Sequence, residues 1–133
     1  MIKGNCLCAS ISYEYDGELT ELAVCHCGQC RRAQGSAFAT NAPVKSAQFT
    51  ITAGEELLKS YYSCPGKRRV FCSNCGSPIF SQRDDTPEVM RLRVGTITSG
   101  NIRAPDYQIY CADKADWLVL SDNKPKYVGN VPE

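Results

Sequence analysis

Three cysteines fall within six residues of this chain, in the segment Cys25-His26-Cys27-Gly28-Gln29-Cys30. Three sulfur ligands with no fourth cysteine close by in the sequence are typical of a catalytic zinc ion, which keeps one coordination position open. That position takes water or a substrate thiol, and a thiol bound to zinc loses its proton. The segment therefore predicts a catalytic zinc site held by Cys25, Cys27 and Cys30.

Two other interpretations of this segment stay open. His26 or Cys64 could act as a fourth ligand and close the site as a second structural zinc, or the three thiols could form a redox group without metal. Because side chains alternate along an extended chain, His26 would point away from Cys25 and Cys27. We therefore expect His26 to lie beside the ligands or to face the substrate.

A second group of four cysteines is spread over two distant segments. Cys6 and Cys8 are separated by one residue, and in the strand that we expect there both side chains share one face. Cys72 and Cys75 form a C-x-x-C turn followed by Gly76, which supplies the positive φ that such a turn needs. Four thiolates are the closed ligand set of a structural zinc, which is our prediction for this group. In the alternative, Cys6 and Cys8 are ordinary buried residues and Cys72 and Cys75 form a redox pair; it is disfavoured because the residues that follow Cys75 do not begin a helix.

Basic residues adjoin both groups of cysteines. Arg31 and Arg32 follow the three-cysteine segment, and Lys67-Arg68-Arg69 precedes Cys72. Arginine forks suit a substrate carboxylate, but cations here could equally offset the negative charge of zinc thiolates. For Lys67 and Arg68 we favour charge compensation. The residues that we expect to bind substrate are Arg31, Arg32, Ser36 and Arg69.

Short β-like runs must position these segments. They are rich in β-branched and aromatic residues and are separated by turns that contain glycine or proline. The predicted strands are Ile11–Tyr15, Phe38–Thr40, Phe49–Thr52, Leu57–Tyr62, Arg69–Phe71, Pro78–Phe80, Val89–Val94 and Tyr107–Tyr110. Trp117–Leu120 is predicted to be a further strand or an apolar plug, and Gly28–Gly35 is the one predicted helix. The fold class is therefore mainly β, with antiparallel sheets joined by turns and one short helix.

The amino-acid composition disfavours several classes of function. Lys and Arg number 15 against 14 Asp and Glu, and the net charge of +1 gives little attraction for a nucleic acid. No apolar run reaches the roughly 20 residues of a membrane span, and none has the length of a signal peptide. Nine cysteines cannot all pair, and Cys111 is predicted to be a free thiol. Clustered cysteines of this kind indicate a reducing compartment, so we expect one cytoplasmic domain over residues 1–133.

The sequence resembles the glutathione-dependent formaldehyde-activating enzyme family over nearly its whole length. The motifs that carry the resemblance are Gly4-x-Cys6-x-Cys8, Cys25-His26-Cys27-x-x-Cys30-Arg31-x-x-x-Gly35-Ser36-Ala37-Phe38 and Tyr61-x-Ser63-x-Pro65-Gly66-x-x-Arg69-x-Phe71-Cys72-x-x-Cys75-Gly76-Ser77-Pro78. The chain departs from the family at Cys64, Thr98 and Gln108, where members often have Ser, Asp and His. These positions lie outside the seven matched cysteines and bear on substrate identity.

The resemblance implies a zinc-bearing antiparallel β-sandwich, also described as a β-tent, with two zinc ions. One ion would be structural, on Cys6, Cys8, Cys72 and Cys75, and one reactive, on Cys25, Cys27 and Cys30. It also implies a carbon–sulfur lyase that condenses glutathione with formaldehyde to S-hydroxymethylglutathione, or cleaves that product. The expected partners are a small thiol and an aldehyde, with no nucleic acid and no membrane, and the chain is compatible with a homodimer. The alternative function is a non-enzymatic, zinc-folded binding or adaptor module.

Overall fold

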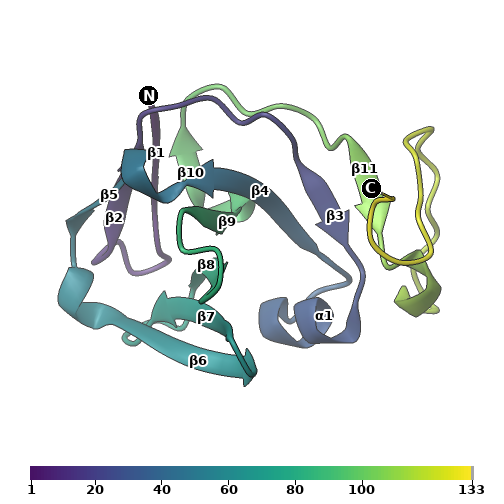
Figure 1. The fold of residues 1–133 in the computed structure, drawn as a ribbon, viewed down its shortest axis with the longest axis horizontal. Helices are drawn as coiled ribbons and strands as arrows, with labels where there is room; N and C mark the ends of the chain where they lie inside the picture. The colour runs from purple at the N-terminus through teal and green to yellow at the C-terminus, as the bar shows by residue number, and fades with distance from the viewer. Residues whose placement is uncertain (133) are drawn as a thin grey trace.

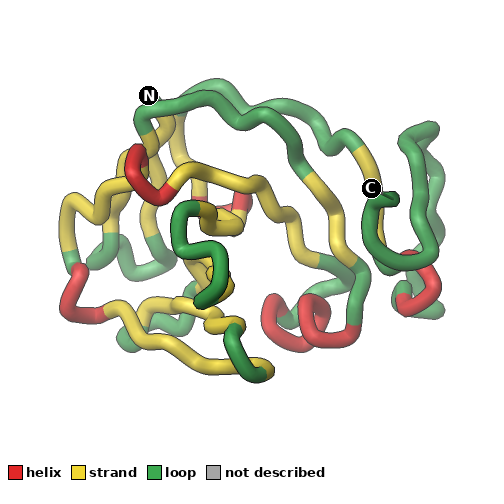
Figure 2. Tube along the Cα trace, viewed as in Figure 1, coloured by secondary structure: helices red, strands yellow, loops and turns green. Residues whose placement is uncertain are grey.

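The computed structural model describes residues 1–132, which form two β-sheets and one α-helix (Figures 1 and 2). In spatial order, the four-stranded sheet consists of β10 (Ile97–Ser99), β1 (Ile2–Asn5), β2 (Ser12–Tyr15) and β5 (Phe49–Ala53). The seven-stranded sheet consists of β11 (Tyr107–Ile109), β3 (Ala23–Cys25), β4 (Ala39–Lys45), β9 (Val89–Arg93), β8 (Pro78–Arg83), β7 (Lys67–Cys72) and β6 (Leu58–Cys64). The helix is α1 (Gly28–Gln34). Four 3-10 turns complete the secondary structure: η1 (Ser46–Gln48), η2 (Glu55–Leu57), η3 (Val94–Thr96) and η4 (Cys111–Asp113).

This architecture confirms a mainly β fold with one short helix. All strand pairs are antiparallel except β11 with β3, which run parallel. The parallel pair arises because the chain crosses from β10, in the smaller sheet, to the outer edge of β3 in the larger one. Loop residues 16–22 and 100–106 run side by side along this crossing (Figure 1). Asp106 joins the loops, since its carboxylate accepts a 2.8 Å hydrogen bond from the Leu22 N–H.

The main core lies between the two sheets and includes side chains from both. Tyr13 of β2 and Leu92 of β9 are almost fully buried, as is Ile79 of β8. Burial of side chains of this size stabilises the fold by about 1.5–3 kcal/mol each. Gly4 of β1 is required by this packing, because a Cβ there would lie 2.3 Å from the Tyr13 ring.

Two local predictions are wrong. Cys6 and Cys8 do not lie in a strand, because β1 ends at Asn5 and the chain turns back into β2. The turn is held by the Ala9 N–H, which donates to the Cys6 carbonyl at 3.0 Å, and Ala9 itself has a φ of 62°.

Trp117–Leu120 is neither strand nor plug. Trp117 is 73% exposed and Val119 is 84% exposed. The hydrophobic side chains of this segment were therefore not sufficient to place it in the core. No helix within residues 1–132 combines the length and the apolar character needed to cross a membrane.

Candidate functional site

Four cysteine sulfurs from distant parts of the chain meet beside the main core. Cys6 and Cys8 come from the β1–β2 turn, Cys72 ends β7, and Cys75 follows in the next turn. All four sulfurs lie within 4.8 Å of one another. The Cys6 and Cys8 sulfurs are 3.5 Å apart, and those of Cys8 and Cys72 are 3.9 Å apart. We call this group the four-sulfur cluster.

Backbone groups hold the four-sulfur cluster in place. The Ile11 N–H donates to the Cys6 sulfur at 3.3 Å. The Leu7 N–H donates to the Ser77 hydroxyl at 2.9 Å, which ties the first turn to the second across 70 residues. In the second turn the Gly76 N–H donates to the Cys72 carbonyl at 2.8 Å, and Gly76 has a φ of 82°. This confirms the prediction that a glycine with positive φ closes the C-x-x-C turn.

The other three cysteines form a compact group where β3 meets α1, the three-sulfur cluster. Cys25 ends β3, Cys27 caps the helix and Cys30 lies in its first turn. The Cys27 sulfur accepts a 3.3 Å hydrogen bond from the Cys30 N–H, so this candidate ligand side chain is also the helix cap. Cys25 and Cys30 are buried and Cys27 is half-buried, and all three sulfurs lie within 4.8 Å of one another.

The donor sets fit zinc. Tetrahedral zinc with Zn–S bonds of about 2.3 Å separates its sulfurs by about 3.8 Å, close to the separations in the four-sulfur cluster. All nine cysteines are free thiols, so none of these sulfurs is occupied by a disulfide. Soft thiolate ligands favour zinc over magnesium or calcium. Within residues 1–132, neither His26 nor Cys64 belongs to a group of side chains that could hold a metal ion.

His26 instead occupies a buried position behind the three-sulfur cluster. Its side chain is fully buried, and its Nε2 lies 2.5 Å from the Gln108 Oε1. The Gln108 Nε2 donates to the Asp122 carboxylate at 3.0 Å, which fixes the orientation of the amide. The imidazole packs edge-on against Phe38 with ring centroids 5.6 Å apart. His26 thus lies beside the candidate ligands, which is one of the two places expected for it, and it does not line the cavity next to them.

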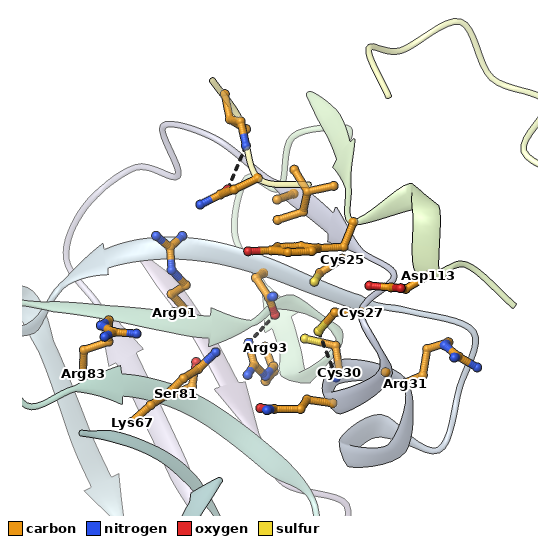
Figure 3. A pocket seen from close by; sticks show the side chains of 18 of the residues that line it. Cys25, Cys27, Cys30, Arg31, Lys67, Ser81, Arg83, Arg91, Arg93 and Asp113 are labelled. Atoms are coloured by element: carbon orange, nitrogen blue, oxygen red, sulfur yellow. Dashed lines mark hydrogen bonds between the residues drawn. The ribbon is translucent and has the colours of Figure 1, made fainter. Parts of the chain in front are cut away.

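A cavity of about 1080 Å³ opens beside the three-sulfur cluster (Figure 3). Cys25, Cys27 and Cys30 lie on one side of it, and Lys67 of β7, Arg83 of β8 and Arg91 of β9 lie on the other. Most charged side chains that line it are cationic. The cations are Arg31, Arg32, Lys67, Arg83, Arg91, Arg93 and Lys114, and the anions are Glu21 and Asp113.

Two guanidinium groups are close to the sulfurs. Arg69 Nη2 lies 4.0 Å from the Cys30 sulfur and 3.3 Å from the Gln29 Oε1. Arg93 is almost fully buried and donates to the Asn41 side-chain oxygen. Thiol hydrogen bonds from Cys25 and Cys27, together with these two positive charges, lower the pKa of Cys30. The positive charges of Arg93 and Arg69 thus favour the thiolate form of Cys30, whereas the hydrogen bonds with Cys27 and Cys30, together with burial, raise the pKa of Cys25.

The same surroundings disfavour further positive charge. Burial lowers the pKa of Arg93 to about 10, against the opposing effect of Cys30. Burial and the neighbouring Arg69 lower the pKa of Lys67. These cations repel one another in a partly desolvated space, so an anion in the cavity would relieve both effects.

The four predicted substrate-binding residues do not all lie in one cavity. Arg31 and Arg32 line the cavity, although the Arg31 side chain points away from the cysteines in Figure 3. Arg69 contacts the three-sulfur cluster. Ser36 lines a separate cavity of about 280 Å³, with Gln34 and Thr96.

Sequence reasoning missed Arg83, Arg91 and Arg93. The alternation in Arg91-Leu92-Arg93 could have indicated that both arginines share one face of a strand, since side chains alternate with period two. Nothing in the sequence alone pairs His26 with Gln108, because they are 82 residues apart and meet only through the β11–β3 pair.

This chain is similar to a known family, to a curated protein and to a solved structure. A sequence profile of the glutathione-dependent formaldehyde-activating enzyme family matches residues 1–113, which include both sulfur clusters. An uncharacterized lyase of Schizosaccharomyces pombe is 32% identical over 78 residues, 59% of this chain and 55% of that protein. The chain thus spans about half the length of that curated relative. The crystal structure of a Rhodobacter sphaeroides protein matches with a TM-score of 0.61 and 26% identity, over 74% of this chain and 90% of that one.

Proposed function

Because this chain belongs to the glutathione-dependent formaldehyde-activating enzyme family, we propose that it is a carbon–sulfur lyase. It joins a small thiol, glutathione or a similar molecule, to an aldehyde such as formaldehyde, and it cleaves the product in reverse. The observation that carries this proposal is the three-sulfur cluster on the wall of a large cationic cavity. The name of the Schizosaccharomyces pombe relative supports the lyase class.

We assign one structural zinc to the four-sulfur cluster and one catalytic zinc to the three-sulfur cluster. Four thiolates would close the first site, whereas Cys25, Cys27 and Cys30 would hold the second ion with three thiolates next to a cavity that can admit a substrate sulfur. Zinc held there would supply charge stabilisation that keeps a thiol deprotonated at neutral pH.

The chain's own residues supply orientation and charge. Arg69, next to Cys30, and buried Arg93 stabilise negative charge on sulfur and on the developing alkoxide. In the forward reaction the substrate thiolate forms a bond to the aldehyde carbon. The carbonyl electron pair moves to oxygen, and that oxygen takes a proton from water. The cavity holds both reactants together, which lowers the entropic part of the barrier.

The experiment measures exchange between free and hydroxymethylated glutathione by NMR, with and without protein. We expect the zinc-loaded protein to raise the exchange rate above the spontaneous rate, and Cys27→Ser to remove that increase. Cys64→Ser is the matched control, since it changes a cysteine that lines the same cavity outside both clusters. No acceleration by folded protein that holds both metals would refute the proposed reaction and favour the zinc-folded binding module.

A further inference from the structure

Besides Arg93, which lies beside the cysteines, three cations line the cavity from adjacent strands: Lys67 of β7, Arg83 of β8 and Arg91 of β9. We call them the basic row. Lys67 pairs in register with Arg83, and Arg91 pairs with Ser81. Because residues two apart on a strand share a face, all three point to the same side of the sheet as Ser81. Figure 3 shows them on the opposite side of the cavity from Cys25, Cys27 and Cys30.

The basic row is poorly neutralised by the protein. Among the residues that the structure describes, Lys67 and Arg91 form no ion pair, and Arg83 has one, with Asp85 at 3.4 Å. Both side chains of that pair are more than half exposed, so it contributes little. Lys67 is half-buried in this positive field. Such an arrangement is stabilised by an anion that enters the cavity.

The thiolates do not account for this excess charge. Three thiolates on a zinc ion carry a formal charge of −1, and Arg69 and Arg93 already lie nearest to Cys30. Lys67 lies two residues before Arg69 on β7, a distance of roughly 7 Å along the strand and away from Cys30. The basic row is therefore placed to contact a part of the substrate remote from its sulfur.

We propose that Lys67, Arg83 and Arg91 form a subsite for a remote oxyanion of the thiol substrate, a carboxylate or a phosphate. This subsite rests on the proposed function, because only that function identifies the ligand as a thiol. Arginine forks and a lysine ammonium both bind such oxyanions by charge-assisted hydrogen bonds. The subsite selects thiols that carry an anion several bonds from sulfur over small uncharged thiols.

The test uses binding rather than catalysis, so it does not depend on the reaction. Calorimetry compares S-methylglutathione with its glycine-carboxyl ethyl ester, and 4′-phosphopantetheine with pantetheine. We expect at least one anionic form to bind the parent about 10-fold or more tightly than its neutralised partner. In the Arg83→Gln/Arg91→Gln double variant we expect that preference to be lost while the neutral forms bind as before. The pair that responds identifies the oxyanion as carboxylate or phosphate.

The control is Lys3→Gln, which removes one positive charge from the four-stranded sheet, away from the cavity. It should leave the preference intact. Equal binding of both members in both pairs, or a preference that survives in the double variant, would overturn the subsite. Glutathione–formaldehyde exchange is measured in parallel. Acceleration without the preference refutes the subsite alone, and the preference without acceleration refutes the reaction alone.

Discussion

The sulfurs of Cys6 and Cys72 are packed within the main hydrophobic core, whereas the three-sulfur cluster has guanidinium neighbours and borders a cavity of about 1080 Å³. The four-sulfur cluster joins segments that are far apart in sequence and that belong to different sheets. The three-sulfur cluster comes from one turn of chain between β3 and α1. The same side chain thus occurs in two different surroundings.

We expect a metal ion in the four-sulfur cluster to contribute mainly to folding, and one in the three-sulfur cluster mainly to chemistry. Metal bound between distant segments constrains the unfolded chain strongly, because it closes a long loop. Metal bound within six residues closes only a short loop and contributes less to the fold. Neighbouring cations and accessible space, by contrast, contribute little to folding and suit a site that binds an anionic reactant.

The largest effect is expected from Cys72→Ser. Structural zinc contributes roughly 10–16 kcal/mol in small domains, which is as large as the whole stability of a typical domain, about 5–15 kcal/mol. The variant should be unfolded or aggregated at 25 °C, as measured by circular dichroism and urea titration. Cys27→Ser is the matched variant and should keep a cooperative unfolding transition. Parent-like melting of Cys72→Ser would remove the distinction between the clusters.

A smaller effect, confined to chemistry, is expected from Arg69→Gln. Removing the guanidinium 4.0 Å from the Cys30 sulfur should lower kcat/KM for the thiol–aldehyde reaction about 10-fold or more. The melting temperature should stay close to that of the parent, because the four-sulfur cluster is untouched. The neighbouring Arg68→Gln is the control, since Arg68 bonds Ser60 and Gln82 instead of the cluster. Equal losses of activity in both variants would contradict a local role for Arg69.

These two sites differ in how far they could be predicted. Cysteine spacing indicated both ligand groups, because C-x-C and C-x-x-C patterns constrain neighbouring sulfurs whatever the surrounding fold. The prediction of a strand at Cys6–Cys8 was wrong because a hairpin turn also brings sulfurs at i and i+2 together. The basic row could not be found in this way, since it depends on the register of β7, β8 and β9.

An intermediate effect on stability is expected from Gln108→Leu. The change removes the acceptor for the buried His26 Nε2 and the donor to Asp122, at a cost of about 1–3 kcal/mol. Because His26 lies between Cys25 and Cys27, the zinc of the three-sulfur cluster should be extracted faster by a chelator. The other zinc should leave at the parent rate. Faster loss of both ions would mean that the clusters are not independent.

The smallest effect is expected from Cys64→Ser. Its sulfur is half-buried on the cavity wall and belongs to neither cluster. The free energy of unfolding should change by no more than about 0.5 kcal/mol, and both metals should be retained. Loss of one metal in this variant would identify Cys64 as a fourth ligand and turn the three-sulfur cluster into a second closed site.

Stepwise zinc extraction tests most directly the proposal that the two clusters hold two ions, one structural and one catalytic. Zinc content is counted by elemental analysis while far-UV circular dichroism follows the fold during titration with a chelator. We expect two ions per chain, one from each cluster. The ion of the three-sulfur cluster should leave first, without loss of structure, and it should be missing from Cys27→Ser. Removal of the ion of the four-sulfur cluster should unfold the protein. One ion per chain, or simultaneous loss of both ions with unfolding, would contradict the assignment of two separate zinc sites.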